Sequence, residues 1–522
     1  GVTLAPDAEK ESYNEQFYLY LALTKASEQV VLTYSVMTSK GESKRPSYLI
    51  NRVKQVFPKL VVEKEEMDTS YEKIMGSDKG KSYLISHLAD GTYAKDVIWW
   101  EIASHYEKKT PGILKDLLGI REKRAGNNSL KKEAAKRLFG DVLYGSVTRF
   151  EQYVQCPFAF FAHYGLLLNE RQQYEISSLD HGNLFHQAME HLSHELEQRN
   201  KNWQDLSEKE AVLLAAECVD AVAERYQGRK YFQSNRVSFM LKRLKNEVVH
   251  SVWAMWHQMQ EGDFVQTYTE KGFRGNDKEW ESMCIPFGED AKICLNGVID
   301  RVDLCSLPGE ELIKVIDYKS SDSQDLSLAK VYYGLQMQLL TYLEAAKEMV
   351  EKEHKGKEAV PAAMLYYAIK EKNLDWKPES EEEYEKRVLD SMKCKGYVNE
   401  EPEIIGHLDK SVVNGGELIP GQKSGVVPVA VDKKGLLKKN SGALSTKDFE
   451  TLIAHTKEKM KECGKAILDG KIEAIPYVYE DNDGCTYCPY GSVCGHESKK
   501  DGVREMKKMS DDEVWEALYG DD

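Results

Sequence analysis

The sequence has no run of residues that could cross a membrane as a helix. Such a helix needs about 20 consecutive apolar residues, and no stretch of the 522 residues approaches that length. No signal peptide opens the chain, which begins at Gly1 instead of a methionine and so suggests a piece of a longer polypeptide. Internal repeats and low-complexity tracts are absent as well, and we expect a cytoplasmic, folded protein.

The chain also lacks an excess of positive charge. Asp and Glu number 86 against 71 Lys and Arg, which gives a net charge of −15. Because a protein that coats nucleic acid concentrates positive charge, this balance argues against a general coating role and leaves room only for a narrow basic channel. Clusters around Arg124 and Lys434 are places to look for one, although solvated helix faces and a flexible loop are the simpler interpretation.

Cysteine is too sparse for a secreted disulfide scaffold, with ten residues in the chain. Six are scattered and are expected to be small buried apolar side chains: Cys218, Cys284, Cys294, Cys305, Cys394 and Cys463. Near the end of the chain, Cys485, Cys488 and Cys494 follow the spacing C-x₂-C-x₅-C, which favours metal thiolates. Cys156 is the candidate fourth ligand, since it shares a Cys-Pro step with Cys488. Spacing alone does not separate zinc from an iron–sulfur cluster.

Hydrophobic patterning predicts an α/β protein in four parts. Residues 1–60 contain an amphipathic helix followed by a β-branched strand, and residues 61–140 form a helical linking region. Residues 141–500 start with helices and change to a run of strands from about Phe264, with long helices between and after the strands. Residues 501–522 are predicted to be an acidic tail.

Two carboxylates and a lysine are predicted to lie at one end of a sheet. This pattern suits phosphate chemistry. Asp300 lies in GVIDRVD and Asp317 in IDYKSS, so neighbouring strands would place both at one end of a sheet. Lys319 projects from the same face as Asp317, because strand side chains repeat every second residue, and Asp303 points away from Asp300. Carboxylate oxygens suit a divalent cation, and an ammonium suits the attacking water. For D-x-K alone, a salt bridge at the strand end is the simpler explanation.

The order of motifs makes this pattern more specific. His186 lies on the predicted helix LFHQAMEHL upstream, and Gln338 and Tyr342 occupy positions i and i+4 of a downstream helix. As a set, H…GxxD…DYK…QxxxY resembles the RecB family of PD-(D/E)XK nucleases, in which histidine replaces the usual helical acid. The resemblance covers roughly residues 141–500 and implies a restriction-endonuclease-like nuclease core with large helical additions.

The resemblance implies a role for each matching residue. His186, Asp300 and Asp317 would hold Mg²⁺, or Mn²⁺ or Ca²⁺ in its place, with the backbone carbonyl of Tyr318 as a further ligand. Lys319 would serve the attacking water and complete a catalytic set with the two aspartates.

Other residues have less direct roles. Gln338 and Tyr342 would contact the DNA backbone or support the metal ligands, and Glu270 is expected to be a surface charge on a strand. In the resembled nucleases a one-plus-three set of cysteines binds a 4Fe–4S cluster. This resemblance assigns the cluster to Cys156, Cys485, Cys488 and Cys494.

The start of the chain points to a helicase-related ancestor. Residues 17–35 resemble the last conserved segment of superfamily-one helicases, but Lys25 stands where an arginine contacts the ATP γ-phosphate. Lysine cannot reproduce the planar fork of arginine, and the chain has no GxxxxGK(S/T) loop. We therefore expect a helicase-like remnant without ATPase activity. Two further segments, LYGSVTRFEQYVQCPFAFF and DHGNLFH, accompany this remnant. Together, these features make the chain resemble the B subunits of bacterial AddAB helicase–nucleases.

That resemblance implies a metal-dependent exonuclease that degrades the 5′-ended strand during double-strand-break processing for homologous recombination. Its partners would be single-stranded DNA from an unwound end and the AddA helicase subunit, in a heterodimer. Two alternatives stay open. A stand-alone iron–sulfur exonuclease of the CRISPR-adaptation type would be much shorter and lack residues 1–60. A non-catalytic DNA-end clamp or scaffold would normally have lost its metal ligands.

Overall fold

The computed structural model divides the chain into two compact units, residues 1–121 and residues 122–522. The residues that it describes are 8–37, 43–63, 80–82, 84–85, 97–117, 129–169, 178–227, 235–274, 280–288, 291–319, 325–369, 374–375, 377–496 and 502–520. Within these ranges, no helix is both long and apolar enough to cross a membrane. Arg124, the centre of one basic cluster, lies outside the described residues.

The first unit is mainly helical and has a small core. Its helices are α1 (Ala8–Thr24), α2 (Tyr48–Val56) and α4 (Val97–Lys109). The core cluster is made by Leu84, Ile102, Ala103 and Tyr106. The strand predicted after the first helix does not form. A strand needs a hydrogen-bonded neighbour, and the described part of this unit offers that stretch only an isolated bridge between Met37 and Ser43. The helicase-like character of this region is not confirmed.

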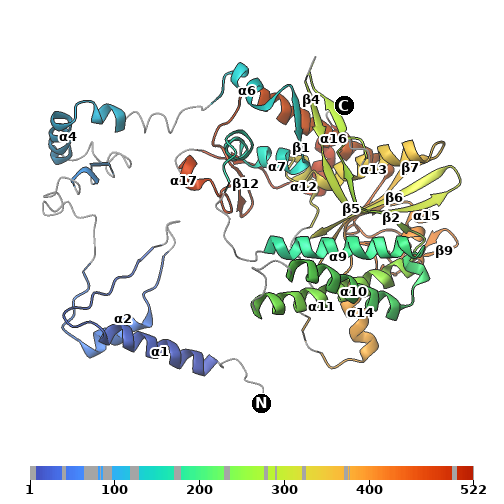
Figure 1. Ribbon diagram of the computed structural model, residues 1–522, viewed down its shortest axis with the longest axis horizontal. Helices are drawn as coiled ribbons and strands as arrows, with labels where there is room; N and C mark the ends of the chain where they lie inside the picture. The colour runs from blue at the N-terminus through green and yellow to red at the C-terminus, as the bar shows by residue number, and fades with distance from the viewer. Residues whose placement is uncertain are drawn as a thin grey trace. The chain divides into compact units, whose positions relative to one another are not determined.

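A six-stranded mixed sheet forms the centre of the second unit (Figure 1). In spatial order its strands are β11 (Ala443–Leu444), β8 (Lys395–Asn399), β7 (Glu358–Ala368), β6 (Glu310–Lys319), β5 (Gly297–Leu307) and β2 (Val265–Phe273). β6 and β7 are parallel, whereas β5 runs antiparallel to both β6 and β2. β6 is buried along its length except at its two end residues. It is buried because helices cover both faces of the sheet.

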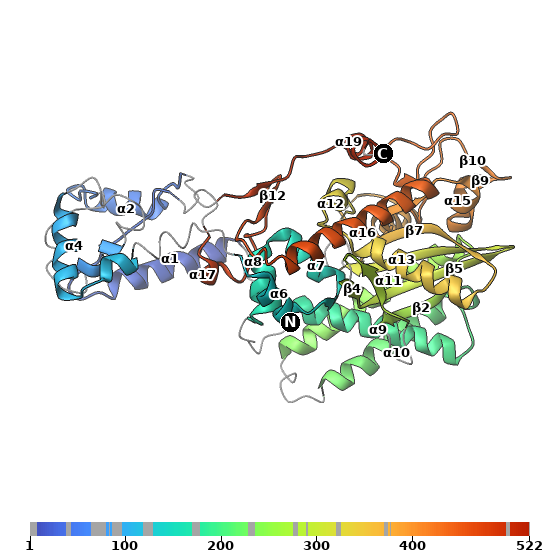
Figure 2. The same ribbon diagram turned by 90° about the horizontal axis from the view of Figure 1, so that it is seen from above.

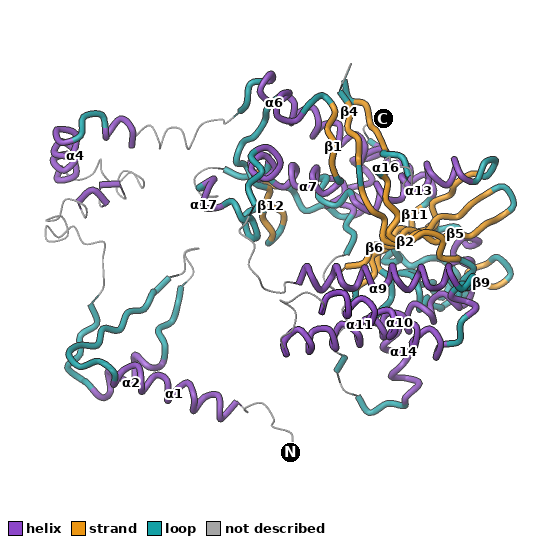
Figure 3. The backbone as a smooth tube through the Cα atoms, viewed as in Figure 1, coloured by secondary structure: helices purple, strands orange, loops and turns teal. Residues whose placement is uncertain are grey.

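The two faces carry different helices (Figures 1 and 3). One is covered by α9 (Ser178–Gln198), α10 (Glu208–Gln227) and α11 (Asn235–Gln260). The other is covered by α12 (Leu328–Tyr332), α13 (Gln338–Glu353) and α16 (Thr446–Leu468), of which α13 and α16 lie side by side in Figure 2. Successive residues of β6 alternate between two separate cores, with Val315 on the α13 side and Ile316 on the α9 side.

Two smaller sheets accompany the central one. The first contains β1 (Val142–Gly145), β4 (Lys292–Leu295) and β3 (Met283–Pro286). The second contains β13 (Asn482–Asp483), β12 (Tyr477–Tyr479) and β14 (Arg504–Glu505). The remaining elements of this unit are α6 (Lys132–Phe139), α7 (Val147–Gln155), α8 (Pro157–Phe160), a π-helix (Phe161–Gly165), 3₁₀ turns (Trp203–Asp205 and Lys410–Val412), α14 (Glu381–Ser391), α15 (Pro402–Leu408), β9 (Val413–Asn414), β10 (Glu417–Leu418), α17 (Gly491–Cys494) and α19 (Asp511–Tyr519).

Residues 502–520 are folded, although residues 501–522 were expected to form an acidic tail. α19 begins with a capping box, in which Ser510 and Glu513 each bond the other's backbone N–H. Its Val514 is fully buried in the core on the α13 side. The acidic residues of its first turn therefore serve a helix N-terminus, where negative charge is stabilising.

The prediction that all six scattered cysteines are buried apolar side chains is wrong for Cys284, while Cys294 is buried as expected but is bonded to it. Cys284 on β3 is exposed and forms a disulfide with Cys294 on β4. The antiparallel register places the two residues directly opposite each other, with their Cα atoms 4.2 Å apart. The prediction is confirmed for the other four, which are buried free cysteines: Cys218, Cys305, Cys394 and Cys463.

Candidate active site

Three neighbouring strands bring three carboxylates side by side at one end of the sheet. Arg301 pairs with Ile316 across β5 and β6, so that Asp300 and Asp317, the next residue along each strand, face each other. On the other side of β5, the pairs before and after Glu270 place that residue opposite Asp300. The acids come from positions far apart in the sequence, and strand register alone makes them neighbours.

His186 joins this group from helix α9. Its Nδ1 atom lies 2.8 Å from Glu270 Oε1 and 3.6 Å from Asp300 Oδ1. The expectation that Glu270 is only a surface strand charge is therefore wrong. Glu270 has a positive φ of 46°, a backbone conformation that is strained for a residue with a side chain and that often occurs at functional sites.

These residues fit a divalent cation. One ligand atom from each of His186, Glu270 and Asp300 can be chosen so that all three lie within 4.8 Å of one another. An imidazole nitrogen and carboxylate oxygens are a donor set that suits Mn²⁺ or Mg²⁺. Asp317 is not part of this closest group. It forms a salt bridge with Lys319 instead, at 2.5 Å from Oδ2 to Nζ.

Lys319 is held between two partners. Besides Asp317, its Nζ donates to Gln338 Oε1 at 3.0 Å, and Gln338 in turn donates to the hydroxyl of Tyr342 at 2.9 Å. The two roles expected for Gln338 and Tyr342, contact with the DNA backbone or support of the metal ligands, stay predictions, and the geometry connects both residues to Lys319. Tyr342 is buried, and an ammonium has three donors, so Lys319 keeps one N–H for a further acceptor.

Burial and crowding change the acidity of the site. Burial, and then the charge of Asp317, raise the pKa of Asp300 well above its usual value. Burial likewise raises the pKa of Asp317, against the opposing charge of Lys319. For His186, burial alone would lower the pKa, but the hydrogen bond to Glu270 and the charge of Asp300 outweigh burial and raise it. Bound cations relieve this kind of repulsion between carboxylates.

Strand geometry also fixes how each acid points. The backbone N–H of Tyr318 donates to Asp300 Oδ2 at 2.7 Å, which orients that carboxylate.

Gly297, at the start of β5, leaves room for two aromatic rings. A Cβ at this position would meet the ring of Phe273 at 2.6 Å and the ring of Tyr342 at 3.3 Å. The glycine of the GxxD motif therefore allows Tyr342 to pack beneath the site.

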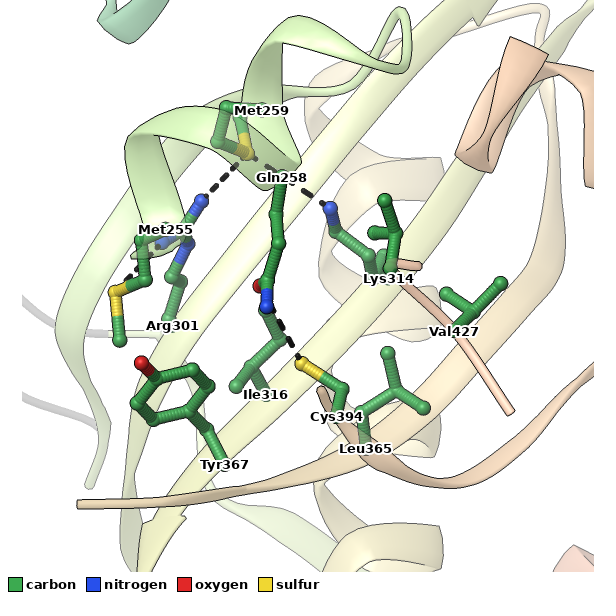
Figure 4. A pocket seen from close by; sticks show the side chains of 11 residues that line it. Met255, Gln258, Met259, Arg301, Lys314, Ile316, Leu365, Tyr367, Cys394 and Val427 are labelled. Atoms are coloured by element: carbon green, nitrogen blue, oxygen red, sulfur yellow. Dashed lines mark hydrogen bonds between the residues drawn. The ribbon is translucent and has the colours of Figure 1, made fainter. Parts of the chain in front are cut away.

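Asp303 lies on the opposite face of β5, as predicted. It accepts from Arg301 Nε at 2.7 Å and pairs with Lys314 Nζ at 2.8 Å, and both Asp303 and Arg301 are buried. A cavity of about 20 Å³ lies beside the two cations (Figure 4), a volume that suits a single water molecule. In Figure 4 the sulfur of Met259 bridges Arg301 and Lys314. The ion pairs of Asp303 therefore hold β5 and β6 together on the face opposite the acidic cluster.

The four cysteines predicted to hold a cofactor gather in one place. Burial and then Asp483 raise the pKa of Cys485 to about 11, and the nearby thiols of Cys156, Cys488 and Cys494 add to the shift. All four are free cysteines. Nearby, both ring nitrogens of His496 are buried and have no hydrogen-bonding partner among the described residues. The thiols of Cys156, Cys488 and Cys494 near Cys485, together with the orphaned imidazole, fit a thiolate-held cluster.

Hydrogen bonds join the two parts of the chain that carry these cysteines. Arg504 donates to the backbone carbonyls of Val154 and Gln155, just before Cys156. His163 Nδ1 lies 2.8 Å from the hydroxyl of Tyr490, which stands between Cys488 and Cys494. The start and the end of the second unit therefore meet at the cysteines, more than three hundred residues apart in the sequence.

Two residues of the site region were not found from the sequence. Glu270 needs the register between β2 and β5, which no local pattern shows. Glu151, on α7, was given no role in the sequence analysis. Its Oε1 atom accepts the backbone N–H of Met337 at 2.6 Å, next to Gln338. Its sequence signal is weak, an acid among the apolar residues of FEQYV.

The chain belongs to the PD-(D/E)XK nuclease superfamily, whose profile matches residues 145–495. The mixed α/β architecture of the second unit agrees with this match.

Three relatives that match nearly the whole chain are each named as the B subunit of an ATP-dependent helicase/deoxyribonuclease. The protein from Lachnoclostridium phytofermentans is 34% identical over 530 residues, covering 100% of this chain and 44% of the relative. That from Clostridium perfringens (strain 13 / Type A) is 31% identical, covering 99% and 45%. That from Clostridioides difficile (strain 630) is 30% identical, covering 100% and 46%. The resemblance to the B subunits of AddAB enzymes is confirmed. The chain spans less than half the length of these relatives.

Proposed function

We propose that this chain is a metal-dependent DNA exonuclease that degrades the 5′-ended strand as a duplex end is unwound for recombination. The observation that carries the proposal is the meeting of His186, Glu270 and Asp300 beside the Asp317–Lys319 pair. The names of the relatives support deoxyribonuclease chemistry and a role as one subunit of a helicase complex. We further propose that the partner is an AddA-type helicase subunit, in a heterodimer.

In this proposal His186, Glu270, Asp300 and Asp317 hold the cation, with the Tyr318 carbonyl as a further candidate ligand. When bound, a divalent cation supplies charge neutralisation at the scissile phosphate and makes water at the site more acidic. Lys319 orients the attacking water with the donor that Asp317 and Gln338 leave free. The water oxygen attacks phosphorus and the water gives up a proton to solvent, while the bond to the leaving oxygen breaks and that oxygen takes up a proton from solvent.

We also propose that Cys156, Cys485, Cys488 and Cys494 hold a 4Fe–4S cluster. The cluster would supply a covalent link between the start and the end of the nuclease region. Its thiolates come from two segments that already contact each other through Arg504 and Tyr490. ATP hydrolysis is assigned to the partner, because this sequence has no phosphate-binding loop.

Cleavage of labelled DNA tests the proposed activity. Single-stranded oligonucleotides labelled at the 5′ or the 3′ end are incubated with Mg²⁺ and either the wild-type chain or Asp317→Ala. Wild type is expected to shorten the DNA, whereas Asp317→Ala loses at least about a hundredfold in rate because a buried ligand and the partner of Lys319 are removed. Asp220→Ala, an exposed acid on α10, is the control and should cleave like wild type.

Equal cleavage by wild type and Asp317→Ala would show that the active site lies elsewhere. Binding of DNA without cleavage by wild type, with and without the AddA-type subunit, would favour the non-catalytic clamp. Release of labelled nucleotides from the 3′ end alone would contradict the proposed strand polarity.

A further inference from the structure

Glu151 lies between the cysteine-bearing part of the chain and the lysine of the site. It belongs to α7, whose Val147, Phe150, Tyr153 and Val154 are buried. α7 ends at Gln155, so Cys156 follows it directly. The helix also packs against α13 and α16. A carboxylate on the inner side of such a helix is costly unless it is hydrogen-bonded.

The partner of Glu151 is the N-terminus of α13. Backbone N–H groups in the first turn of a helix have no acceptor within the helix, and the N-cap residue Met337 has no side chain that could accept. Glu151 Oε1 accepts the Met337 N–H at 2.6 Å. The N-cap of α13 is thus supplied from a different helix, and a carboxylate suits the positive end of the helix dipole.

The first residue of α13 is Gln338, the residue that holds Lys319. A continuous set of contacts therefore runs from Glu151 to the start of α13, from Gln338 to Lys319 at 3.0 Å, and from Lys319 to Asp317 at 2.5 Å. If the first turn of α13 shifted, Gln338 would shift with it. Lys319 would then keep Asp317 as its partner but lose the contact that sets the direction of its free N–H.

We propose that Glu151 is a positioning residue that holds Lys319 in place through the first turn of α13. The proposal deepens the proposed nuclease function and rests on it for its catalytic consequence. The placement of Lys319 itself does not depend on that function. Burial raises the pKa of Glu151 to about 7, and the Met337 N–H and the charge of Lys319 limit that rise.

The first test measures Lys319 directly and needs no DNA. Purified chain is treated with a limiting amount of acetic anhydride, and acetylation of Lys319 is quantified by peptide mass spectrometry. Glu151→Ala should raise the acetylation of Lys319 severalfold, because the ammonium is less firmly held. Glu151→Gln keeps an oxygen acceptor for the Met337 N–H and should restore most of the protection. Gln152→Ala, a half-buried neighbour on α7, is the matched control and should leave labelling unchanged.

The second test is kinetic. In Glu151→Ala we expect kcat to fall roughly tenfold or more, since small displacements of a catalytic group are costly, while KM for DNA and the iron content stay near wild type. Glu151→Gln should recover most of kcat, which a general packing defect would not allow. Unchanged Lys319 labelling in Glu151→Ala would overturn the inference. If Glu151→Ala raises Lys319 labelling but the wild-type chain does not cleave DNA, the inference stands and the proposed function is overturned instead.

Discussion

At the scale of single residues, the acidic site is held together against its own repulsion. Asp300 and Asp317 are buried and face each other across two strands. Folding raises the pKa of both groups, so at pH values above these raised pKa values their ionised forms reduce the free energy of unfolding. The site therefore costs stability until a cation, a proton or Lys319 compensates the charge.

Asp300→Asn should accordingly stabilise the metal-free protein while abolishing cleavage. Because ionised Asp300 opposes folding, we expect the metal-free variant to unfold at a higher temperature than wild type at neutral pH. The amide oxygen can still accept the Tyr318 N–H. Thermal unfolding followed by circular dichroism, in the presence of a chelator, measures the effect.

The stability difference between wild type and Asp300→Asn should depend on pH. As pH falls towards the raised pKa, wild-type Asp300 takes up a proton and regains stability, so the advantage of the variant should shrink. Mg²⁺ should raise the unfolding temperature of wild type more than that of the variant. A lower unfolding temperature for chelated Asp300→Asn at neutral pH would contradict this account, and Asp220→Asn on the surface serves as the control.

At the scale of elements, β5 and β6 separate two kinds of charge. The face towards α13 carries the acids of the site, and the opposite face carries Asp303 between Arg301 and Lys314. Burial alone would raise the pKa of Asp303, but the two cations outweigh burial and lower it. Its charge thus stabilises the fold above the ordinary aspartate pKa, and this stability is lost as pH falls through the lowered value.

Asp303→Asn should therefore be among the most destabilising substitutions in the sheet. It leaves two buried cations with no carboxylate between them, and such losses cost about 3–5 kcal/mol. Urea unfolding of wild type and variant measures the difference. Asp390→Asn is the matched control, because Asp390 also pairs with two lysines, Lys393 and Lys423. These pairs lie on the surface, where a salt bridge contributes about 1 kcal/mol or less to stability. Equal losses in both variants would contradict the argument.

At the scale of the whole molecule, the second unit is closed by contacts between its beginning and its end. The segments around Cys156 and Cys488 meet through Arg504 and through the His163–Tyr490 pair. A link between positions more than three hundred residues apart removes many conformations from the unfolded chain. The proposed cluster would therefore act on the stability of the nuclease region as a whole.

Cys156→Ala should lose the brown colour, most of the bound iron and much of the stability of the purified protein. Iron analysis, visible absorbance and thermal unfolding together measure the loss. Cys218→Ala, a buried cysteine on α10 away from the four thiols, should keep its iron and colour. A Cys156→Ala protein with full iron content and unchanged stability would end the cluster proposal.

Local patterns in the sequence were enough to predict the nuclease superfamily and the core of the fold. Alternation of apolar residues placed Asp300 and Asp317 on strands, and the two-residue repeat of a strand correctly predicted that Asp303 points away from the site. The motif order correctly led to the nuclease superfamily. The four-cysteine cluster remains a prediction that the gathered thiols support.

Tertiary structure alone decided which further groups join the site. Glu270 reaches His186 because of the register of β2 on β5, and Glu151 reaches the start of α13 because two helices pack together. The Cys284–Cys294 disulfide and the folding of residues 502–520 arise in the same way. Periodicity and spacing within a segment determine its own structure, whereas these contacts depend on how separate strands and helices pack against each other.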